Sequence, residues 1–255
     1  MQGSLALKKN ITVTEFIKFL LNETNLKQIK LRFPSQKVER YIWGEVSAYE
    51  LALSLKPTGY FSHYTAMWLH GLTDQRPKVI YLKCEQLEKP NHQRPLEQKN
   101  IDWAFRQRPR KSKNVANYKD QKICLLYGAN TGNLGVIETE GTNGERIPVS
   151  NVERTLIDIS VRPFYSGGVA EILKAYKLAK EKVSIENLLT MLKEMDFLYP
   201  YHQAIGFYLE KSGVYEELLI QPFKRLEMQH DFYLSNQMKD VLYSTEWRLY
   251  YPKGL

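Results

Sequence analysis

The spacing of apolar residues predicts a helix near the start of the chain. Thr12 followed three residues later by Glu15 forms a possible capping box, in which each residue hydrogen-bonds the backbone amide of the other. We expect the helix to run to about Leu21. Its apolar residues fall on one side, so we expect four of them to face inward: Phe16, Ile17, Leu20 and Leu21.

A hairpin and two short helices are predicted next. Residues 27–33 alternate apolar and basic side chains, and residues 38–43 read as a returning strand. Ser47 and Glu50 form a second capping box, opening a helix that ends before Pro57. A third helix starts at Ser62 and ends at Gly71. The first 72 residues therefore predict the order helix, hairpin, helix, helix.

The pattern between residues 78 and 149 changes to short runs typical of strands. Polar loops separate the runs, and residues 128–144 are rich in Gly, Asn and Thr, which favour turns. The predicted strands are Val79–Lys83, Ile101–Phe105, Lys122–Tyr127 and Leu134–Glu138.

After residue 150 the spacing of apolar residues is helical again. The predicted helices cover residues 151–161, 168–182, 185–195 and 200–212, and the last forty residues are aromatic, which favours strands that pack back on the body. Strands followed by helices, without regular alternation, predict an α+β fold with a mixed β-sheet and a helical C-terminal part.

The stretch from Ile147 to Gly168, IPVSNVERTLIDISVRPFYSGG, combines several signals. Ser150 and Glu153 have the spacing of a capping box, and Pro163 should stop the helix. Arg154 and Asp158 stand one turn apart, so we interpret them as an ion pair on the helix. If buried near Arg162, that pair would orient the turn at Gly167 and Gly168.

The positive charge lies in the front of the chain. The formal net charge is +8, and residues 1–183 hold 29 Lys and Arg against 18 Asp and Glu, whereas residues 184–255 hold 7 against 10. A basic front suits binding to phosphates and equally suits docking on an acidic partner.

Two stretches concentrate this charge. Residues 105–114 form an exposed cationic loop in the prediction, with Arg106, Arg108, Arg110, Lys111 and Lys113 as candidate DNA-binding residues. The predicted hairpin adds four more candidates: Lys30, Arg32, Lys37 and Arg40. The hairpin would act as a wing beside a helix in a groove, or as an edge hairpin kept soluble by its lysines.

Three ordered blocks resemble the AbiEi antitoxins of type IV toxin–antitoxin systems. They are the stretch 147–168, the segment GYFSHYTAMWLHGL at 59–72 with the strand after it, and YPYHQAIGFYLEKSG at 199–213. The resemblance implies a cytoplasmic bacterial antitoxin that neutralises a nucleotidyltransferase-type toxin. It also implies an N-terminal winged helix-turn-helix that represses the operon by binding operator DNA. We therefore expect an N-terminal region at 1–75 and an antitoxin domain at 76–255.

The chain departs from that family at its N-terminus. A winged helix-turn-helix needs three helices and a wing, but only one predicted helix precedes the hairpin. Either the module is reduced, with residues 48–56 as the recognition helix, or it is missing. In the second case, docking on a protein partner would be the whole function.

The sequence gives little support for catalysis. His63 and His70 lie two helical turns apart, but no Asp, Glu or Cys stands at a spacing that completes a metal site. We therefore expect no enzyme activity, no catalytic residues, no metal and no cofactor. A nucleic-acid-processing enzyme that uses one of these histidines with an acidic residue remains an alternative.

The apolar runs are too short for a membrane helix, which requires about 20 residues. The N-terminus lacks an apolar stretch of signal-peptide length, and the two cysteines, Cys84 and Cys124, are too few for a disulfide framework. We therefore expect a cytoplasmic protein without a membrane partner.

Overall fold

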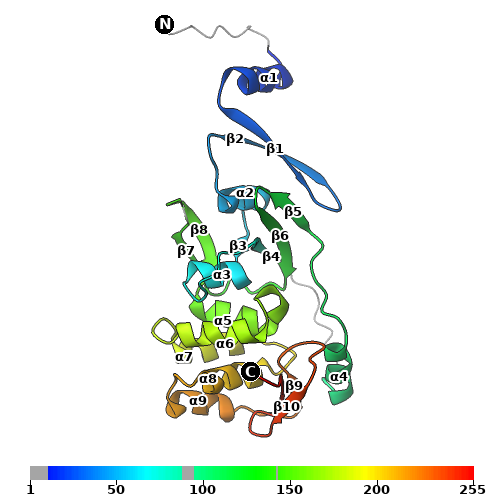
Figure 1. The fold of residues 1–255 in the computed structure, drawn as a ribbon, viewed down its shortest axis with the longest axis vertical. Coiled ribbons are helices and arrows are strands. Elements are labelled where there is room, and N and C mark those ends of the chain that lie inside the picture. Colours follow the sequence, from blue (N-terminus) through cyan, green and yellow to red (C-terminus); the bar gives the residue numbers. More distant parts are fainter. Residues whose placement is uncertain (1–10, 88–94, 142) are drawn as a thin grey trace.

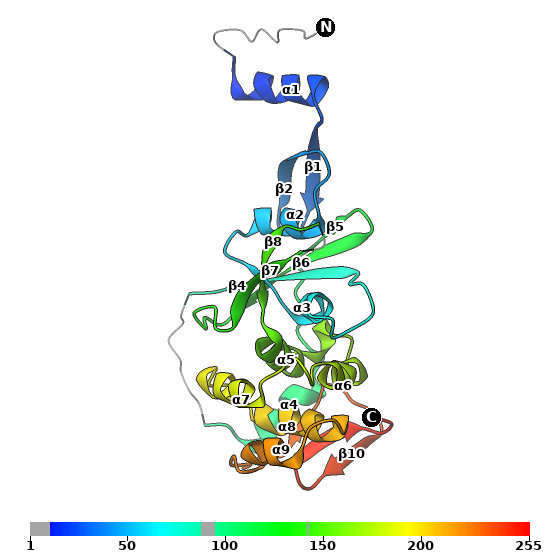
Figure 2. The same cartoon turned by 90° about the vertical axis from the view of Figure 1, so that its left-hand side faces the viewer.

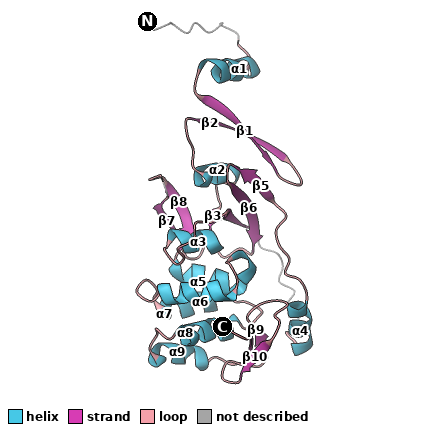
Figure 3. Ribbon diagram, in the orientation of Figure 1, coloured by secondary structure: helices cyan, strands magenta, loops and turns pink. Residues whose placement is uncertain are grey.

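The computed structural model describes residues 11–87, 95–141 and 143–255. The chain forms an elongated body with three regions (Figure 1). A helix and a hairpin within residues 13–43 occupy one end, a six-stranded sheet lies in the middle, and the helices and strands of residues 152–252 form the other end (Figure 2). The fold mixes helices and strands, which confirms the predicted α+β class (Figure 3).

Helix α1, Val13–Glu23, begins at the predicted capping box. The Glu15 amide donates to Thr12 Oγ1, and the Thr12 amide donates to the Glu15 carboxylate. The predicted inward face is wrong, because no residue of α1 is buried and Phe16 remains 37% exposed. The helix stands beyond the hairpin, where the described chain supplies no second layer to cover its apolar side (Figure 1).

The predicted hairpin is confirmed. Strands β1, Leu26–Arg32, and β2, Lys37–Trp43, pair antiparallel, with Arg32 opposite Lys37 next to the turn. Leu31 and Phe33 are buried in a core that also includes helix α2, Ala48–Leu55, whose predicted capping box is present. The hairpin is therefore attached to the body through its turn end and α2.

The central sheet has the order β5-β6-β4-β3-β8-β7. Strands β4 and β6 are parallel, as are β3 and β8, and the other neighbours are antiparallel. The strands are β3 Tyr60–Phe61, β4 Val79–Glu85, β5 Val115–Tyr118, β6 Gln121–Gly128, β7 Val136–Glu140 and β8 Arg146–Ser150. Strands β3, β5 and β8 were not predicted, and β7 begins two residues after the predicted start.

Residues 101–105 are helical, so the predicted strand there is wrong. They belong to helix α4, Gln98–Arg106. The apolar alternation of Ile101, Trp103 and Phe105 misled the prediction, because Trp103 points to solvent and is 64% exposed. Ile101 and Phe105, four residues apart, share the buried side of one helix.

The helical end of the molecule is built around α5, Val152–Val161, in which residues 153–160 are all buried. Pro163 ends α5 as predicted and opens a short 3-10 turn, and Gly167 and Gly168 adopt positive φ before the next helix. The remaining helices are α3 His63–Leu69, α6 Val169–Leu178, α7 Ile185–Glu194, α8 Tyr201–Ser212 and α9 Glu217–Lys224, the last of which was not predicted.

The C-terminal residues form the predicted strands. They are β9 Phe232–Tyr233, β10 Val241–Ser244 and β11 Leu249–Pro252, in the order β10-β11-β9. Trp247, between β10 and β11, is fully buried against α8. The domain boundary near residue 75 stays a prediction, and across it β3 pairs with both β4 and β8. Within the described ranges, none of the helices has the length and apolar character needed to cross a membrane.

Candidate functional site

The predicted cationic loop links α4 to the central sheet. We call residues 106–113 the cationic segment. Arg106 ends α4, and the residues after it run along the side of the molecule to β5 (Figure 1). Its backbone is fixed near the middle of the molecule, because the Ser112 amide donates to the Tyr165 hydroxyl at 2.6 Å and Ser112 Oγ donates to the Leu125 carbonyl at 2.8 Å. The segment is therefore held in place at Ser112.

The charged side chains of the cationic segment form no ion pairs within the described part of the chain. These five cations are Arg106, Arg108, Arg110, Lys111 and Lys113. The Lys111 ammonium lies 6.0 Å from the centre of the Phe164 ring, within cation–π range. These cations are available to an external anion.

Two of the candidate DNA-binding residues of the hairpin already contact other groups of the chain. Lys30 Nζ lies 3.8 Å from a Glu39 carboxylate oxygen, and Arg40 Nη2 donates to the Ser54 carbonyl at 3.0 Å. Arg32 and Lys37 stand opposite each other at the turn. In Figure 1 the hairpin lies far from α4, where the cationic segment begins, whereas the other end of the segment leads into β5, next to β1. The fold therefore does not bring Arg106 and the hairpin candidates into one cluster.

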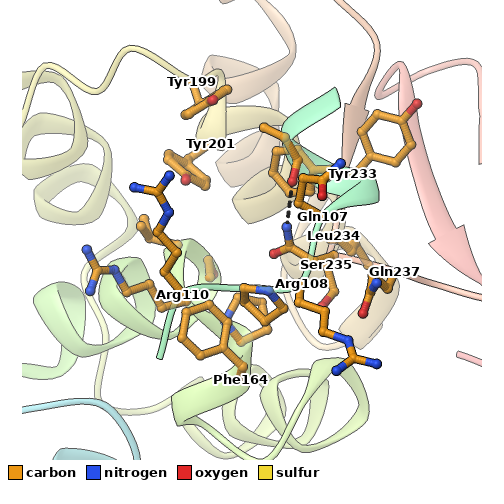
Figure 4. Close-up of a pocket in the computed structure, with 18 of the residues that line it drawn as sticks. Gln107, Arg108, Arg110, Phe164, Tyr199, Tyr201, Tyr233, Leu234, Ser235 and Gln237 are labelled. Atoms are coloured by element: carbon orange, nitrogen blue, oxygen red, sulfur yellow. Dashed lines mark hydrogen bonds between the residues drawn. The ribbon is translucent and has the colours of Figure 1, made fainter. Parts of the chain in front are cut away.

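A cavity of about 960 Å³ opens beside the cationic segment. Arg108 and Arg110 line it from the segment, and Arg162 lines it from the end of α5. Figure 4 shows Phe164 on the opposite side of this cavity from Tyr199 and Tyr201. Its lining includes no Asp or Glu. An open pocket lined by three arginines and no carboxylate favours an anionic ligand.

Packed aromatic rings support one wall of the cavity. The Phe105 ring stacks on Tyr233 with centroids 5.4 Å apart and meets Phe232 edge-to-face at 5.0 Å. Tyr199 meets Phe105 edge-to-face at 6.0 Å. Because these rings hold one another, the wall is preorganised.

A buried charge cluster lies next to this cavity, under the central sheet. Arg154 Nε lies 3.3 Å from Asp158 Oδ1, which confirms the predicted ion pair. Lys83 Nζ reaches the same oxygen at 3.1 Å, and Arg154 Nη2 donates to the Tyr60 hydroxyl at 2.9 Å. A second cavity, of about 310 Å³, is lined by Lys83, Arg154 and Asp158 and shares Arg162 with the first.

Burial and charge act in opposite directions on this cluster. Burial raises the pKa of Asp158, but the Lys83 and Arg154 cations outweigh it, so the net shift is downward and the carboxylate stays ionised. Burial lowers the pKa of His63 to about 3, despite the opposing effect of Asp158. The His63 ring, with Nδ1 2.9 Å from Ser62 Oγ, is therefore neutral at pH 7.

The predicted capping box at the start of α5 is wrong. Ser150 remains in β8, where its hydroxyl lies 2.9 Å from Thr155 Oγ1, and the helix begins two residues later. Asn151 is the N-cap and accepts from the Arg154 amide at 2.8 Å. The Glu153 carboxylate instead accepts from the Ser184 amide at 2.8 Å, because strand pairing leaves the Ser150 backbone engaged with β7.

The expected orientation of the glycine corner by the ion pair stays a prediction, and the neighbours of Gly167 are other side chains. A Cβ on Gly167 would lie 3.2 Å from the Tyr64 ring and 2.9 Å from Glu171 Cγ, so the corner packs against those side chains. The second histidine singled out in the sequence, His70, places Nε2 2.6 Å from the Ser150 carbonyl oxygen. Within the described residues, no group of three side chains could hold a metal ion.

Sequence reasoning missed the aromatic side of the cavity. Trp103 and Phe164 flank the cationic segment, but the strand assignment hid the exposure of Trp103. Tyr199 comes from the loop before α8 and Tyr201 is the first residue of α8, nearly a hundred residues away. The available signal was the interleaving of Trp, Phe and Arg in WAFRQRPR at 103–110, which is typical of surfaces that bind nucleic acid.

Comparisons with known proteins inform the fold alone. No family model matches the chain, and no curated protein matches it. Among solved structures, it is similar to the crystal structure of the RV2827C protein from Mycobacterium tuberculosis, with a TM-score of 0.57 and 14% sequence identity over 93% of this chain and 78% of that chain. At this identity the likeness shows a shared fold.

Proposed function

We propose that this chain is a non-catalytic regulator that binds the phosphates of operator DNA through the cationic segment. One observation carries the proposal: the five cations of residues 106–113 form no ion pair within the described chain, and two of them, Arg108 and Arg110, line a cavity without carboxylates. Unpaired arginines and lysines bind phosphate strongly, because contact with the backbone releases condensed counterions.

The biological setting in this proposal comes from the AbiEi resemblance. The chain would act in the cytoplasm as the antitoxin of a type IV system, would neutralise a nucleotidyltransferase-type toxin, and would repress its own operon. The positions that carry the resemblance include Arg154 and Asp158, whose ion pair is buried and links α5 to β4 through Lys83. These residues therefore have a structural role in the proposal, and no cofactor is needed.

Arg32 and Lys37 supply a second contact in this proposal. They lie next to the turn of the hairpin, and Lys37 is exposed there. A hairpin with basic residues near its turn resembles the wing of a winged-helix module. The separate location of the hairpin means that the two regions would contact different parts of a duplex.

An electrophoretic shift with the duplex upstream of the chain's own reading frame tests the proposal. The variant Arg108→Ala/Arg110→Ala/Lys111→Ala should weaken binding at least about tenfold, since each lost phosphate contact removes counterion release. The matched control is Lys177→Ala/Lys180→Ala/Lys193→Ala, which removes the same charge from exposed positions on α6, α7 and the turn after α6. Equal loss in the two variants would show a general charge effect and contradict the proposal.

A protein-docking role without DNA binding is the second candidate. The observation that favours it is the exposed apolar surface at the far end, where Val13 is 76% exposed and Trp43 is 60% exposed. If docking is the whole function, the purified chain will hold the toxin but will not shift the upstream duplex at low salt.

A further inference from the structure

We infer that the cavity beside the cationic segment binds an unpaired nucleotide of a single nucleic acid strand, with the base stacked on an aromatic ring and the phosphate held by arginine. The inference rests on the proposed function in one respect, since both use Arg108 and Arg110 for phosphate. It adds a base-binding site that duplex DNA cannot use.

The charge of the cavity selects an anion. Arg108, Arg110 and Arg162 line it from two different segments, and its lining contains no carboxylate. Its volume of about 960 Å³ lies in the range of pockets that enclose small organic ligands. Guanidiniums from two segments can hold one phosphate from two sides.

The aromatic lining supplies surfaces for a base. Trp103 lines the cavity and is 64% exposed. Its indole packs against no other aromatic ring of the described residues. Phe164 lies across the cavity from Tyr199 and Tyr201 (Figure 4). Bases of a single strand stack on aromatic side chains of this kind, next to cations that follow the backbone.

Amide side chains on the rim add the capacity for hydrogen bonds to a base edge. Gln107 lines the cavity from the end of α4, and Gln237 lines it from the loop after β9 (Figure 4). Asn236 is fixed because its Nδ2 donates to the Ala104 carbonyl at 3.0 Å. Unstacked bases are recognised through such contacts to their edges, whereas the bases of a duplex are stacked within the helix and cannot enter.

Fluorescence anisotropy with the full chain tests this site. The probes are labelled uridine and thymidine oligonucleotides of about 12 residues, which distinguish RNA from DNA as the source of the nucleotide. Trp103→Ala and Phe164→Ala should each weaken binding at least about fivefold, the effect expected for one lost stacking contact. Competition by a mononucleotide at equal affinity would identify the free nucleotide as the source.

A spectroscopic signature separates stacking from a structural effect. Oligonucleotide binding should quench the tryptophan fluorescence of the wild-type chain. Trp103→Phe should retain binding and lose the quench, because phenylalanine keeps an aromatic face and the other tryptophans, Trp43, Trp68 and Trp247, do not line the cavity.

The outcomes distinguish this site from the proposed function. Trp103→Ala should leave binding of the upstream duplex within about twofold of wild type, since a duplex exposes no base to the indole. Duplex binding without any oligonucleotide binding would leave the proposed function standing and overturn the nucleotide site. Equal binding of an acidic peptide, insensitive to Trp103→Ala, would also overturn it and would assign the cavity to a protein partner.

Discussion

At the residue scale, the charges buried under the central sheet impose the strongest constraint. Asp158 is only 4% exposed and accepts from both Lys83 and Arg154, which is fully buried. Removing one partner of such a cluster leaves an uncompensated charge, which typically costs about 3–5 kcal/mol. The spacing of Arg154 and Asp158 predicted their contact, but the sequence offered no sign that Lys83, 75 residues before Asp158, completes the cluster.

The same cluster predicts a pH dependence of stability. The pKa of His63 is about 3 in the folded chain, because of burial, and about 6.5 in the unfolded chain. Below pH 6.5 His63 binds a proton in the unfolded state but stays neutral in the folded state. His63 therefore lowers the free energy of unfolding by about 1.4 kcal/mol per pH unit as pH falls from about 6.5 toward 3.

Urea unfolding at a series of pH values between 7.5 and 5 measures this effect. His63→Asn should reduce the loss of stability over that range by about 2 kcal/mol, since asparagine does not titrate and tolerates the φ of +54° at this position. Part of the slope should remain, because burial also lowers the pKa of His70 and His202. An unchanged slope in the variant would show that His63 has the same pKa in the folded and unfolded chain.

At the element scale, a close approach between α8 and the C-terminal strands decides how the helical end is packed. Gly206 in the middle of α8 meets the Trp247 ring, where a Cβ would lie 2.1 Å from the nearest ring carbon. Glycine is unfavourable inside a helix by about 1 kcal/mol relative to alanine. At this position the cost is offset because only glycine leaves room for the Trp247 ring. The Trp247 indole also donates to Glu210 at 2.7 Å, which fixes the ring over α8.

Gly206→Ala should therefore destabilise the chain by about 1–3 kcal/mol, although alanine is the better helix former. Thermal and urea unfolding measure the change. Combining it with Trp247→Leu, which makes room for the methyl group, should give a smaller loss than the sum of the two single variants. Strict additivity would contradict a direct clash between the two residues.

Helix α1 illustrates what local sequence signals cannot decide. Its capping box and apolar spacing correctly predicted a helix, yet none of its residues is buried. Isolated helices of this length are marginal in water, so most helical stability in proteins comes from packing of an apolar side. Whether an amphipathic face is covered depends on where the neighbouring elements lie.

At the scale of the whole molecule, the distribution of charge predicts how nucleic acid binding responds to salt. The cationic segment and the turn of the hairpin lie in different regions of the elongated body (Figure 1). Each phosphate neutralised contributes about −0.9 to the slope of log affinity against log salt for duplex DNA. A surface with several contacts should therefore bind the upstream duplex with a steep salt dependence.

The variant Arg108→Ala/Arg110→Ala/Lys111→Ala should flatten that slope by about 2 to 3. A titration of duplex binding from low to physiological salt gives the slope directly. Arg32→Ala/Lys37→Ala should flatten it by less than about 2, as expected for two contacts or fewer. A parallel line with a lower intercept for the triple variant would mean that its three cations do not touch phosphate.

The sequence by itself determined the local structure wherever chemistry acts over a few residues. The capping residues of α1 and α2, the alternation in the hairpin, Pro163 and the two glycines after it fixed elements that the structure confirms. Local alternation failed at α4, where exposed Trp103 mimicked a strand face. The prediction that Ser150 caps α5 was wrong because Ser150 belongs to β8, which pairs with β7.

Only the tertiary structure decided the site. The cationic segment was visible in the sequence, but its cavity joins Arg108 to Arg162 and to Tyr199, which are far apart along the chain. The tertiary structure also showed that the hairpin cations lie away from this cavity and that Lys83 forms an ion pair with Asp158. Charge pairing, burial and enclosure depend on distances in space between remote residues, and the order of residues along a chain does not contain those distances.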